Sequence, residues 1–322
     1  MPLVKATPET IARAAEIIKA GGIVSFPTET VYGLGADALN PSAVAGIFEA
    51  KKRPFFDPLI VHIAEISTLD KLCLNIDRRA EKLTGKFWPG PLTLVLEKKD
   101  IVPDLVTSGL NTVAVRIPSH PVALALIKAS GTPIAAPSAN RFGCLSPTTA
   151  RHVESQLHND IDMILDGGPC SVGIESTIIK IDSSGLYLLR SGGIALEEIE
   201  DCAGEKVLIK NAGDIPEAPG QLPWHYSPEK RIIITDSAPA DDIRGGFLYF
   251  TTPLQKSPAE RTLLLSQKGD LKEAAANLFS HLHTLDSMDI DTIYAEPLPY
   301  NGLGAAIMDR LEKASKKFIK NS

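Results

Sequence analysis

The sequence predicts an α/β protein of two domains, in which a largely parallel sheet covered by helices is followed by a smaller, doubly wound domain. Three observations lead to this fold class. Helical and strand patterns alternate almost from end to end, and several strand candidates are apolar on both faces. At 322 residues the chain is also long enough for two hydrophobic cores.

The alternation fails between residues 211 and 229, where Pro and Gly recur and periodicity is lost. We therefore predict a first domain over 1–210, a linker or lid over 211–229 and a second domain over 230–322. In the second domain the sequence predicts strands at 231–235, 247–250, 262–265 and 292–295 and helices near 271–285 and 304–318.

Capping signals place the first two helices. Thr7 is a suitable N-cap, Pro8 a suitable first helical residue, and Gly21 should end the helix. Asn40 opens a second helix, which must end before Arg53 because that residue precedes a proline. The other elements predicted in the first domain are strands at 23–26, 59–64, 92–96, 112–117, 134–136, 163–165, 177–181 and 187–189 and helices at 121–129 and 147–156, the last with Ser146 as its N-cap.

Composition narrows the possible classes of function. The formal charge of −6, from 33 basic and 39 acidic residues, argues against a protein that coats nucleic acid with a basic surface. No apolar run approaches the roughly 20 residues of a membrane helix, and the N-terminus lacks the pattern of a signal peptide, so we expect a cytoplasmic protein. The scattered cysteines predict neither disulfides nor a zinc site.

Familiar catalytic and phosphate-binding motifs are missing from the sequence. Residues 33–38 (GLGADA) match the dinucleotide fingerprint nominally, but Asn40 and Pro41 follow at once, and we reject the match. There is also no P-loop signature, no Gly-x-Ser-x-Gly and no His-Glu-x-x-His. Any phosphate chemistry must therefore use another design.

Charged side chains near the ends of predicted elements are candidate site residues. Lys51 and Arg53 follow a helix, where they are either a solvated cap or cations that neutralise a polyphosphate. Arg116 ends an apolar strand and shares a face with Thr112, so it needs an anionic partner, either a protein carboxylate or a substrate. His62, in an apolar strand, is by itself better explained as a core histidine.

Three further segments follow or precede strands. Residues 137–140 (PSAN) come directly after a strand, at the carboxyl end where open α/β sheets usually bind ligands. Arg190 closes a strand before residues 191–193 (SGG), whose backbone can approach a ligand closely. Residues 175–177 (EST) are equally well explained as an ordinary strand entry.

Taken together and in order, these segments closely resemble the YrdC-like domain of threonylcarbamoyl-AMP synthases, a twisted open sheet with flanking helices. The resemblance continues through 219–220, 225–228 and 302–308, as in the long, two-domain form of the family. The matching segments of the first domain are residues 27–34 (PTETVYGL), 51–54 (KKRP), 58–62 (PLIVH), 88–93 (WPGPLT), 115–116 (VR), 136–140 (APSAN) and 175–177 (EST).

The resemblance implies a nucleotidyltransferase. L-threonine, bicarbonate or CO₂, and ATP would give threonylcarbamoyl-AMP and pyrophosphate, and the product would feed tRNA modification completed by a separate transferase machinery. Mg²⁺ is expected only through the ATP phosphates, with no metal site of protein ligands. The segment that carries Tyr226 is expected to act as a lid, because a carbamate decomposes easily.

The resemblance also implies the site residues by position. Lys51 and Arg53 would be catalytic, and Asp57 stands where the family commonly has an Asn. The L-threonine contacts would be Thr30, His62, Arg116, the backbone of Ala136, and Ser176. The ATP contacts would be Lys51, Arg53, Asp57, Thr112, Ser138, Asn140, Ser146, Arg190 and Tyr226.

Two alternatives stay open at this point. A carbamoyl-adenylate-forming enzyme of another pathway, such as hydrogenase maturation, usually also has cysteine-rich zinc modules, which this sequence lacks. An RNA-binding protein without catalysis would use the concave surface of a YrdC-like domain, although the acidic net charge disfavours it. Direct tRNA binding and transient contact with the transferase machinery are not decided by the sequence.

Overall fold

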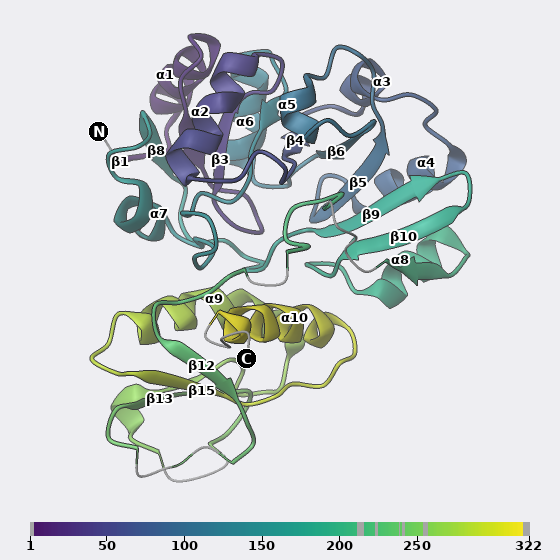
Figure 1. Ribbon diagram of the computed structural model, residues 1–322. Helices are drawn as coiled ribbons and strands as arrows, with labels where there is room; N and C mark the ends of the chain where they lie inside the picture. The colour runs from purple at the N-terminus through teal and green to yellow at the C-terminus, as the bar shows by residue number, and fades with distance from the viewer. Residues whose placement is uncertain are drawn as a thin grey trace.

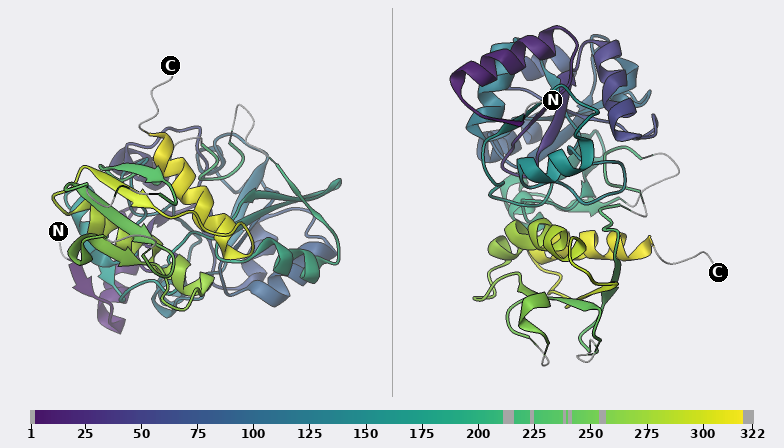
Figure 2. Two further views of the ribbon diagram at one scale, coloured as in Figure 1. Left: turned by 90° about the horizontal axis from the view of Figure 1, so that it is seen from below. Right: turned by 90° about the vertical axis from the view of Figure 1, so that its left-hand side faces the viewer.

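The computed structural model describes residues 3–210, 216–222, 225–237, 239, 242–253 and 257–317. Figure 1 shows a larger body made by the first two-thirds of the chain and a smaller body made by the last third. Helices α9 (Leu271–Asp286) and α10 (Leu303–Lys316) lie between the smaller sheet and the larger body, and Figure 2 shows the same arrangement from another side.

The larger domain is built on an 11-stranded sheet in the order β1-β8-β2-β3-β7-β4-β6-β5-β9-β10-β11. Its strands are β1 (Leu3–Lys5), β2 (Val24–Phe26), β3 (Gly33–Asp37), β4 (Ile60–His62), β5 (Leu92–Glu97), β6 (Thr112–Arg116), β7 (Ile134–Ala135), β8 (Met163–Asp166), β9 (Thr177–Asp182), β10 (Gly185–Arg190) and β11 (Val207–Ile209). Its helices are α1 (Pro8–Lys19), α2 (Pro41–Lys51), α3 (Leu69–Leu72), α4 (Arg78–Phe87), α5 (Asp104–Thr107), α6 (Pro121–Ser130), α7 (Ala150–Leu157) and α8 (Leu196–Ala203), with a 3₁₀ turn, η1 (Ile66–Thr68).

The strands of this sheet run in mixed directions, so the prediction of a largely parallel sheet is wrong for the larger domain. Antiparallel pairs join β2 with β3, β3 with β7, β4 with β7, β5 with β6, and β9 with β10. The reason is clearest at β3, which returns directly alongside β2 without a crossover helix. The rejected Gly-rich motif is thus a buried strand and not a phosphate-binding turn.

The predicted starts of the first two helices are confirmed. Thr7 caps α1 through a capping box, and Pro8 is its first residue. The side chain of Asn40 accepts hydrogen bonds from two backbone N–H groups of α2. That helix ends at Lys52 in a left-handed conformation, with φ at 52°, which turns the chain and directs Arg53 away from the helix axis.

One predicted cap is wrong. The sequence predicts Ser146 as the N-cap of a helix from residue 147, but α7 begins at Ala150 and its cap is Thr149. Ser146 lies three positions before this cap, and its hydroxyl donates to Glu175 at 2.5 Å. Helices α4 and α8 are not among the predicted elements, although both are amphipathic.

The smaller domain contains a four-stranded parallel sheet in the order β12-β15-β13-β14. Its strands are β12 (Arg231–Ile234), β13 (Gly245–Tyr249), β14 (Thr262–Leu264) and β15 (Thr292–Ala295), close to the predicted ranges. In the described part of the chain α9 and α10 cover one face, whereas a doubly wound sheet has helices on both. The described residues between β13 and β14 form no helix other than a 3₁₀ turn, η2 (Ala259–Arg261).

The predicted linker, residues 211–229, falls between the last strand of the larger sheet and the first strand of the smaller one. Residues 211–215 and 223–224 lie outside the described residues. Residues 216–222, here called the strap, lie against the larger sheet, where Ala218 is fully buried in a cluster with Ile60 and Ala114. The strap therefore covers part of the sheet face on which Ile60 lies.

Candidate active site

The strap and the larger sheet border a small hollow of about 40 Å³. It gathers most of the predicted site residues, from segments far apart in the sequence. Those that line it are Thr30, Arg53, His62, Arg116, Ala136, Ser138, Ser176, Arg190 and Tyr226, and with them Thr28, Val31, Gly33, Ile60, Pro137, Glu175, Pro219 and His225.

Arg116 lies at the end of β6 and is 3% exposed. Its Nη2 forms an ion pair with Glu29 at 2.5 Å, its Nη1 donates to Thr30 Oγ1 at 3.0 Å, and its Nε donates to the carbonyl of Gly90 at 3.1 Å. The question left open by the sequence is answered, since a protein carboxylate is the partner of this arginine. Thr30 also exchanges a hydrogen bond with Thr28 at 2.8 Å, which fixes its hydroxyl.

His62 lies beside Arg116 on the neighbouring strand, because β4 and β6 pair in parallel with these two residues in register. Burial, and then the charge of Arg116, lowers the pKa of His62 from 6.5 to about 3. The imidazole is therefore neutral at physiological pH. Ala136 follows β7, which runs antiparallel to β4, and its N–H donates to the carbonyl of Ile60 at 2.9 Å.

Arg53 reaches the hollow from the turn after α2. Its Nη2 lies 2.9 Å from the carboxylate of Asp57 and donates to the carbonyl of Pro58, also at 2.9 Å. Asp57 is fully buried behind Arg53 and does not line the hollow. Burial raises the pKa of Asp57, although Arg53 and Lys51 partly offset that effect.

Lys51 is also buried behind the hollow rather than in it. Its Nζ donates to the carbonyls of Ser138 and Asn140, and its side chain is 1% exposed. Burial, followed by the charge of Arg53, lowers the pKa of Lys51 well below its ordinary value. Lys51 thus fixes the loop that presents Ser138, whose hydroxyl donates to Asn140 at 2.5 Å.

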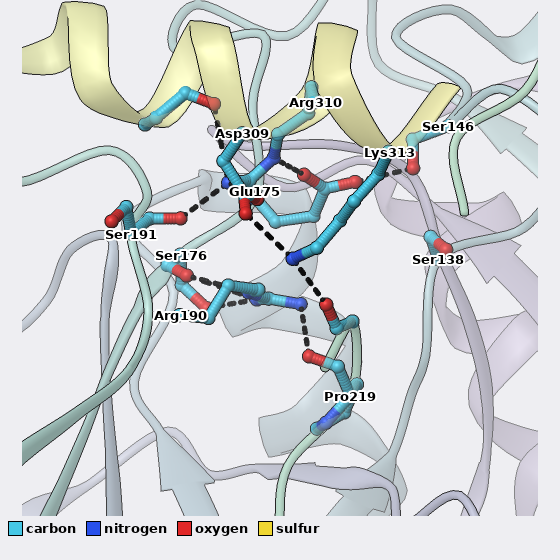
Figure 3. Close-up of polar contacts among 12 residues, drawn as sticks. Ser138, Ser146, Glu175, Ser176, Arg190, Ser191, Pro219, Asp309, Arg310 and Lys313 are labelled. Atoms are coloured by element: carbon cyan, nitrogen blue, oxygen red, sulfur yellow. Dashed lines mark hydrogen bonds and ion pairs between the residues drawn. The ribbon is translucent and has the colours of Figure 1, made fainter. Parts of the chain in front are cut away.

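Arg190, at the end of β10, joins the strap to the sheet, as Figure 3 shows. Its Nη1 donates to the carbonyl of Pro219 at 3.2 Å, and its Nη2 donates to the carbonyl and hydroxyl of Ser176 at 3.0 and 3.1 Å. Tyr226 closes the same side of the hollow; its backbone has a φ of 60°, and its ring packs against His225 with centroids 4.3 Å apart. An anion that reached Arg190 in the hollow would compete with the carbonyl of Pro219, in the strap, for its guanidinium.

Thr112 is the one predicted site residue that the structure leaves apart from the others. It begins β6, at the opposite end from Arg116, and lines a separate hollow with Lys180 and Asp182. Strand alternation correctly predicts that Thr112 and Arg116 share one face of the strand. It does not bring them together, because residues four apart in a strand lie roughly 13 Å apart. Ser146 and Asn140 do not line the hollow themselves, but each forms a hydrogen bond with a residue that does, Glu175 and Ser138 respectively.

Two acidic residues of the site, Glu29 and Glu175, are not among the predicted site residues. Glu29 pairs with Arg116 and also accepts from the N–H of Ser119 at 3.1 Å. Glu175 lines the hollow and pairs with Arg310 of α10 at 3.0 Å. A signal existed for Arg310, since it falls on the apolar stripe of its helix, where an unpaired charge would be costly.

The arrangement is suited to binding anions. Arg53, Arg116 and Arg190 enter one hollow from three separate segments, and a guanidinium can grip a carboxylate or phosphate with two parallel hydrogen bonds. Among the described residues no group of three or more His, Cys, Asp or Glu side chains could hold a metal ion. In the same part of the chain, no helix has the length and apolar character needed to cross a membrane.

Comparison with known proteins identifies the family. Residues 16–192 match the Sua5, YciO and YrdC family described as telomere recombination, and residues 194–316 match the family described as threonylcarbamoyl-AMP synthase, C-terminal domain. The chain belongs to the threonylcarbamoyl-AMP synthase family. The family predicted from the ordered motifs is thereby confirmed.

The relatives of the threonylcarbamoyl-AMP synthase family match over nearly the full chain. The enzyme of that name from Pyrococcus abyssi is 44% identical over 316 residues, which cover 94% of this chain and 93% of the relative. The one from Bacillus subtilis is 43% identical over 320 residues, covering 95% and 92%. A crystal structure of P. abyssi Sua5 complexed with L-threonine superimposes with a TM-score of 0.88 at 42% identity, covering 97% of this chain and 96% of that one. The predictions of an α/β fold with a large twisted sheet, flanking helices and a second domain, and of an enzyme, are confirmed.

Proposed function

We propose that this protein synthesises threonylcarbamoyl-AMP from L-threonine, bicarbonate or CO₂, and ATP, with release of pyrophosphate. The product would serve the modification of tRNA to its threonylcarbamoyladenosine form, in the cytoplasm, and pass to a separate transferase machinery. Direct binding of tRNA is not required by this reaction. The observation that supports the proposal most is the convergence of Arg53, Arg116 and Arg190 on one hollow.

The L-threonine end of the hollow is assigned to Arg116, Thr30 and His62. A substrate carboxylate would approach the guanidinium of Arg116, which Glu29 and Gly90 hold in a fixed plane. The neutral His62 beside it adds no positive charge that would repel the ammonium group of L-threonine when it binds. A crystallised relative named for its complex with L-threonine supports this assignment.

The nucleotide end is assigned to Arg53, Ser138 and Arg190, supported from behind by Lys51 and Asn140. Asp57 and Ser146 would act through Arg53 and Glu175, and contact by Thr112 would require the nucleotide to extend along the sheet under the strap. Because the strap occupies that face, with Ala218 buried on it, ATP and the strap would compete for the same space. We therefore assign the strap and Tyr226 to a lid that rearranges when the nucleotide enters.

The proposed chemistry depends on placement and charge neutralisation. The amine of L-threonine adds to CO₂ and loses one proton, which gives a carbamate. An oxygen of the carbamate attacks the α-phosphorus of ATP, the bond from that phosphorus to the bridging oxygen of the β-phosphate breaks, and pyrophosphate leaves. Arg53 would neutralise the charge that develops on the pyrophosphate, Lys51 would hold the loop of Ser138 from behind, and closure of the lid would keep water from the carbamate.

Mg²⁺ is expected to enter with ATP. The donor set fits a cation held mainly by phosphate oxygens and water, since the described residues offer isolated carboxylates and no cluster of ligands. Asp57 is paired with Arg53 and lies behind the hollow, so the phosphates and water would supply the ligands of the metal. When bound, the ion supplies further neutralisation of the leaving pyrophosphate.

The test is pyrophosphate release from ATP, measured with and without L-threonine and bicarbonate. Release should require both, and Arg116→Ala should abolish it. Arg244→Ala is the matched control, because this exposed arginine of the smaller domain forms its ion pairs, among the described residues, with Asp289 and Asp291. Pyrophosphate release without L-threonine, or full activity of Arg116→Ala, would refute the proposal.

A further inference from the structure

A buried arginine of the smaller domain reaches the wall of the hollow. Arg310, on α10, is 0% exposed, and its Nε lies 3.0 Å from Glu175 Oε2 in the larger domain. Its Nη1 donates to the carbonyl of Ser191 at 2.6 Å and to Asp309 at 3.0 Å. Figure 3 shows the guanidinium entering from the helix and Glu175 turned toward it. The two domains are thus joined by a buried ion pair beside the candidate active site.

Glu175 connects this ion pair to the predicted nucleotide residues. While Oε2 contacts Arg310, Oε1 accepts a hydrogen bond from the hydroxyl of Ser146 at 2.5 Å. Glu175 lines the hollow directly, and Arg310 and Ser146 do not. The carboxylate is therefore the middle member of a chain that runs from α10 through the wall of the hollow to Ser146.

The charge of Glu175 is unfavourable for the ligand proposed above. A carboxylate on the wall of a hollow that receives a triphosphate repels it, unless a cation neutralises the carboxylate from the other side. Arg310 is placed to do so, because it approaches from behind the wall and leaves the hollow free. Burial acts to lower the pKa of Arg310, but Tyr226, Glu175 and Asp309 raise it overall, so the guanidinium stays charged.

The surroundings of Arg310 hold it in this position. Asp309 contacts Arg310 and also pairs with Lys313 at 2.7 Å, and Lys313 donates to the carbonyl of Gly220 in the strap at 2.8 Å. The ring of Tyr226 lies under the guanidinium, with 5.2 Å between the ring centroid and Cζ. A lid residue, the strap and the ion pair therefore meet on one turn of α10.

We propose that Arg310 is a positioning residue for the nucleotide: it neutralises Glu175 and orients it toward Ser146, so that the smaller domain completes the ATP end of the site. This role rests on the proposed function for the identity of the nucleotide. It makes α10 a structural part of the active site in addition to any part it has in holding the strap.

The experiment compares Arg310→Met with the double variant Arg310→Met/Glu175→Gln. Methionine keeps much of the apolar volume and removes the charge, and glutamine keeps the acceptor for Ser146 without a charge. Arg310→Met should raise the KM for ATP at least about tenfold and change the KM for L-threonine by less than about threefold. Adding Glu175→Gln should restore most of the ATP affinity, because the unpaired carboxylate is then gone.

Lys313→Met provides the matched control, since Lys313 lies on the same helix and contacts the strap but not Glu175. Adding Glu175→Gln should not restore anything that Lys313→Met loses. An unchanged ATP KM in Arg310→Met, or no recovery in the double variant, would overturn the proposal. Thermal unfolding and L-threonine binding establish that each variant is folded, and Arg310→Gln, which also removes the charge, replaces Arg310→Met if that variant is not.

A non-hydrolysable ATP analogue separates this inference from the proposed function. If the wild-type protein binds the analogue but does not release pyrophosphate from ATP in response to L-threonine and bicarbonate, the proposed reaction fails. The comparison of Arg310→Met with its double variant can still be made by titration with the analogue. Recovery of analogue binding in the double variant would support the role of Arg310, and equal binding by all variants would overturn it.

Discussion

The carboxylate of Asp57 lies 2.9 Å from the guanidinium of Arg53, and both side chains are almost completely buried. An arginine that is proposed to bind phosphate is therefore already paired with an internal anion. Removing one partner of a buried ion pair destabilises a protein strongly, by roughly 3–5 kcal/mol. The same change frees the remaining partner for an external ligand.

Asp57→Asn is accordingly expected to lower the KM for ATP, because a carboxylate that competes with the triphosphate for Arg53 is removed. The expected change is roughly threefold to tenfold, which corresponds to about 1 kcal/mol. Thermal unfolding should show a loss of stability in the same variant. Steady-state kinetics with varied ATP provide the measurement.

Asp77→Asn is the control for Asp57→Asn, because Asp77 also pairs with an arginine, Arg79, but at the start of α4. It should reduce stability without changing the ATP KM. If Asp57→Asn raises the ATP KM instead, the carboxylate helps to hold the nucleotide, and competition with ATP is excluded.

Thr30→Val tests the L-threonine end of the hollow. Valine has nearly the same shape but cannot accept the hydrogen bond from Arg116, so the guanidinium loses one of the contacts that fix its plane. We expect the KM for L-threonine to rise roughly tenfold, equal to about 1.4 kcal/mol, with little change in the KM for ATP. Thr84→Val removes a buried hydroxyl that bonds only within α4 and should affect neither constant.

The stability of the protein should fall as the pH is lowered below about 6.5. The folded-state pKa of His62, about 3, lies below its ordinary 6.5, so between these two values the unfolded chain binds a proton that the folded chain does not. Each pH unit in this interval should cost about 1.4 kcal/mol for this residue, or about 2 kcal/mol between pH 6.5 and pH 5.

Denaturant titrations at several pH values measure this dependence. His62→Asn should reduce the loss of stability between pH 6.5 and pH 5 by about the amount assigned to His62. His158→Asn is the comparison, because His158 is exposed at the end of α7 and should leave the slope as it is. A slope that is the same in His62→Asn and in the wild type would contradict the assignment.

Ala218→Glu should detach the strap from the larger sheet. Ala218 is 0% exposed in a cluster with Ile60 and Ala114, and an unpaired carboxylate cannot be buried there without a large cost. Hydrogen exchange of residues 216–222 should increase strongly, and pyrophosphate release should decline because the carbamate is less protected. Ala218→Ser is small enough to stay docked and should exchange like the wild type.

The sequence predicts which residues meet in the hollow better than it predicts the directions of the strands in the sheet. Only the ordered set of motifs identifies the site residues Arg53, Arg116, Ser138 and Arg190, because each of them has an ordinary structural explanation by itself. Their convergence follows from long-range strand pairing, such as the in-register pairing of His62 with Arg116. No periodicity within a segment contains that information.

Three errors of prediction have different physical causes. The direction of β3 was unpredictable from alternation, because a strand that follows another without a helix gives the same local pattern in either direction. The N-cap at Ser146 failed because Thr149, another residue suited to capping, accepts from the N–H of His152 and starts the helix three positions later. Thr112 lies apart from Arg116 because alternation along a strand predicts the side of the sheet on which a residue lies, but not its position along the strand.

Glu175 and Arg310 are separated by 135 residues of chain. During translation the larger domain leaves the ribosome first and can begin to fold while α10 has not yet been made. Until then Glu175 has no cationic partner from that helix, and the nascent enzyme carries an uncompensated negative charge beside its substrate cavity. Maturation of the catalytic centre is thus a late event in biosynthesis, set by the arrival of a single helix.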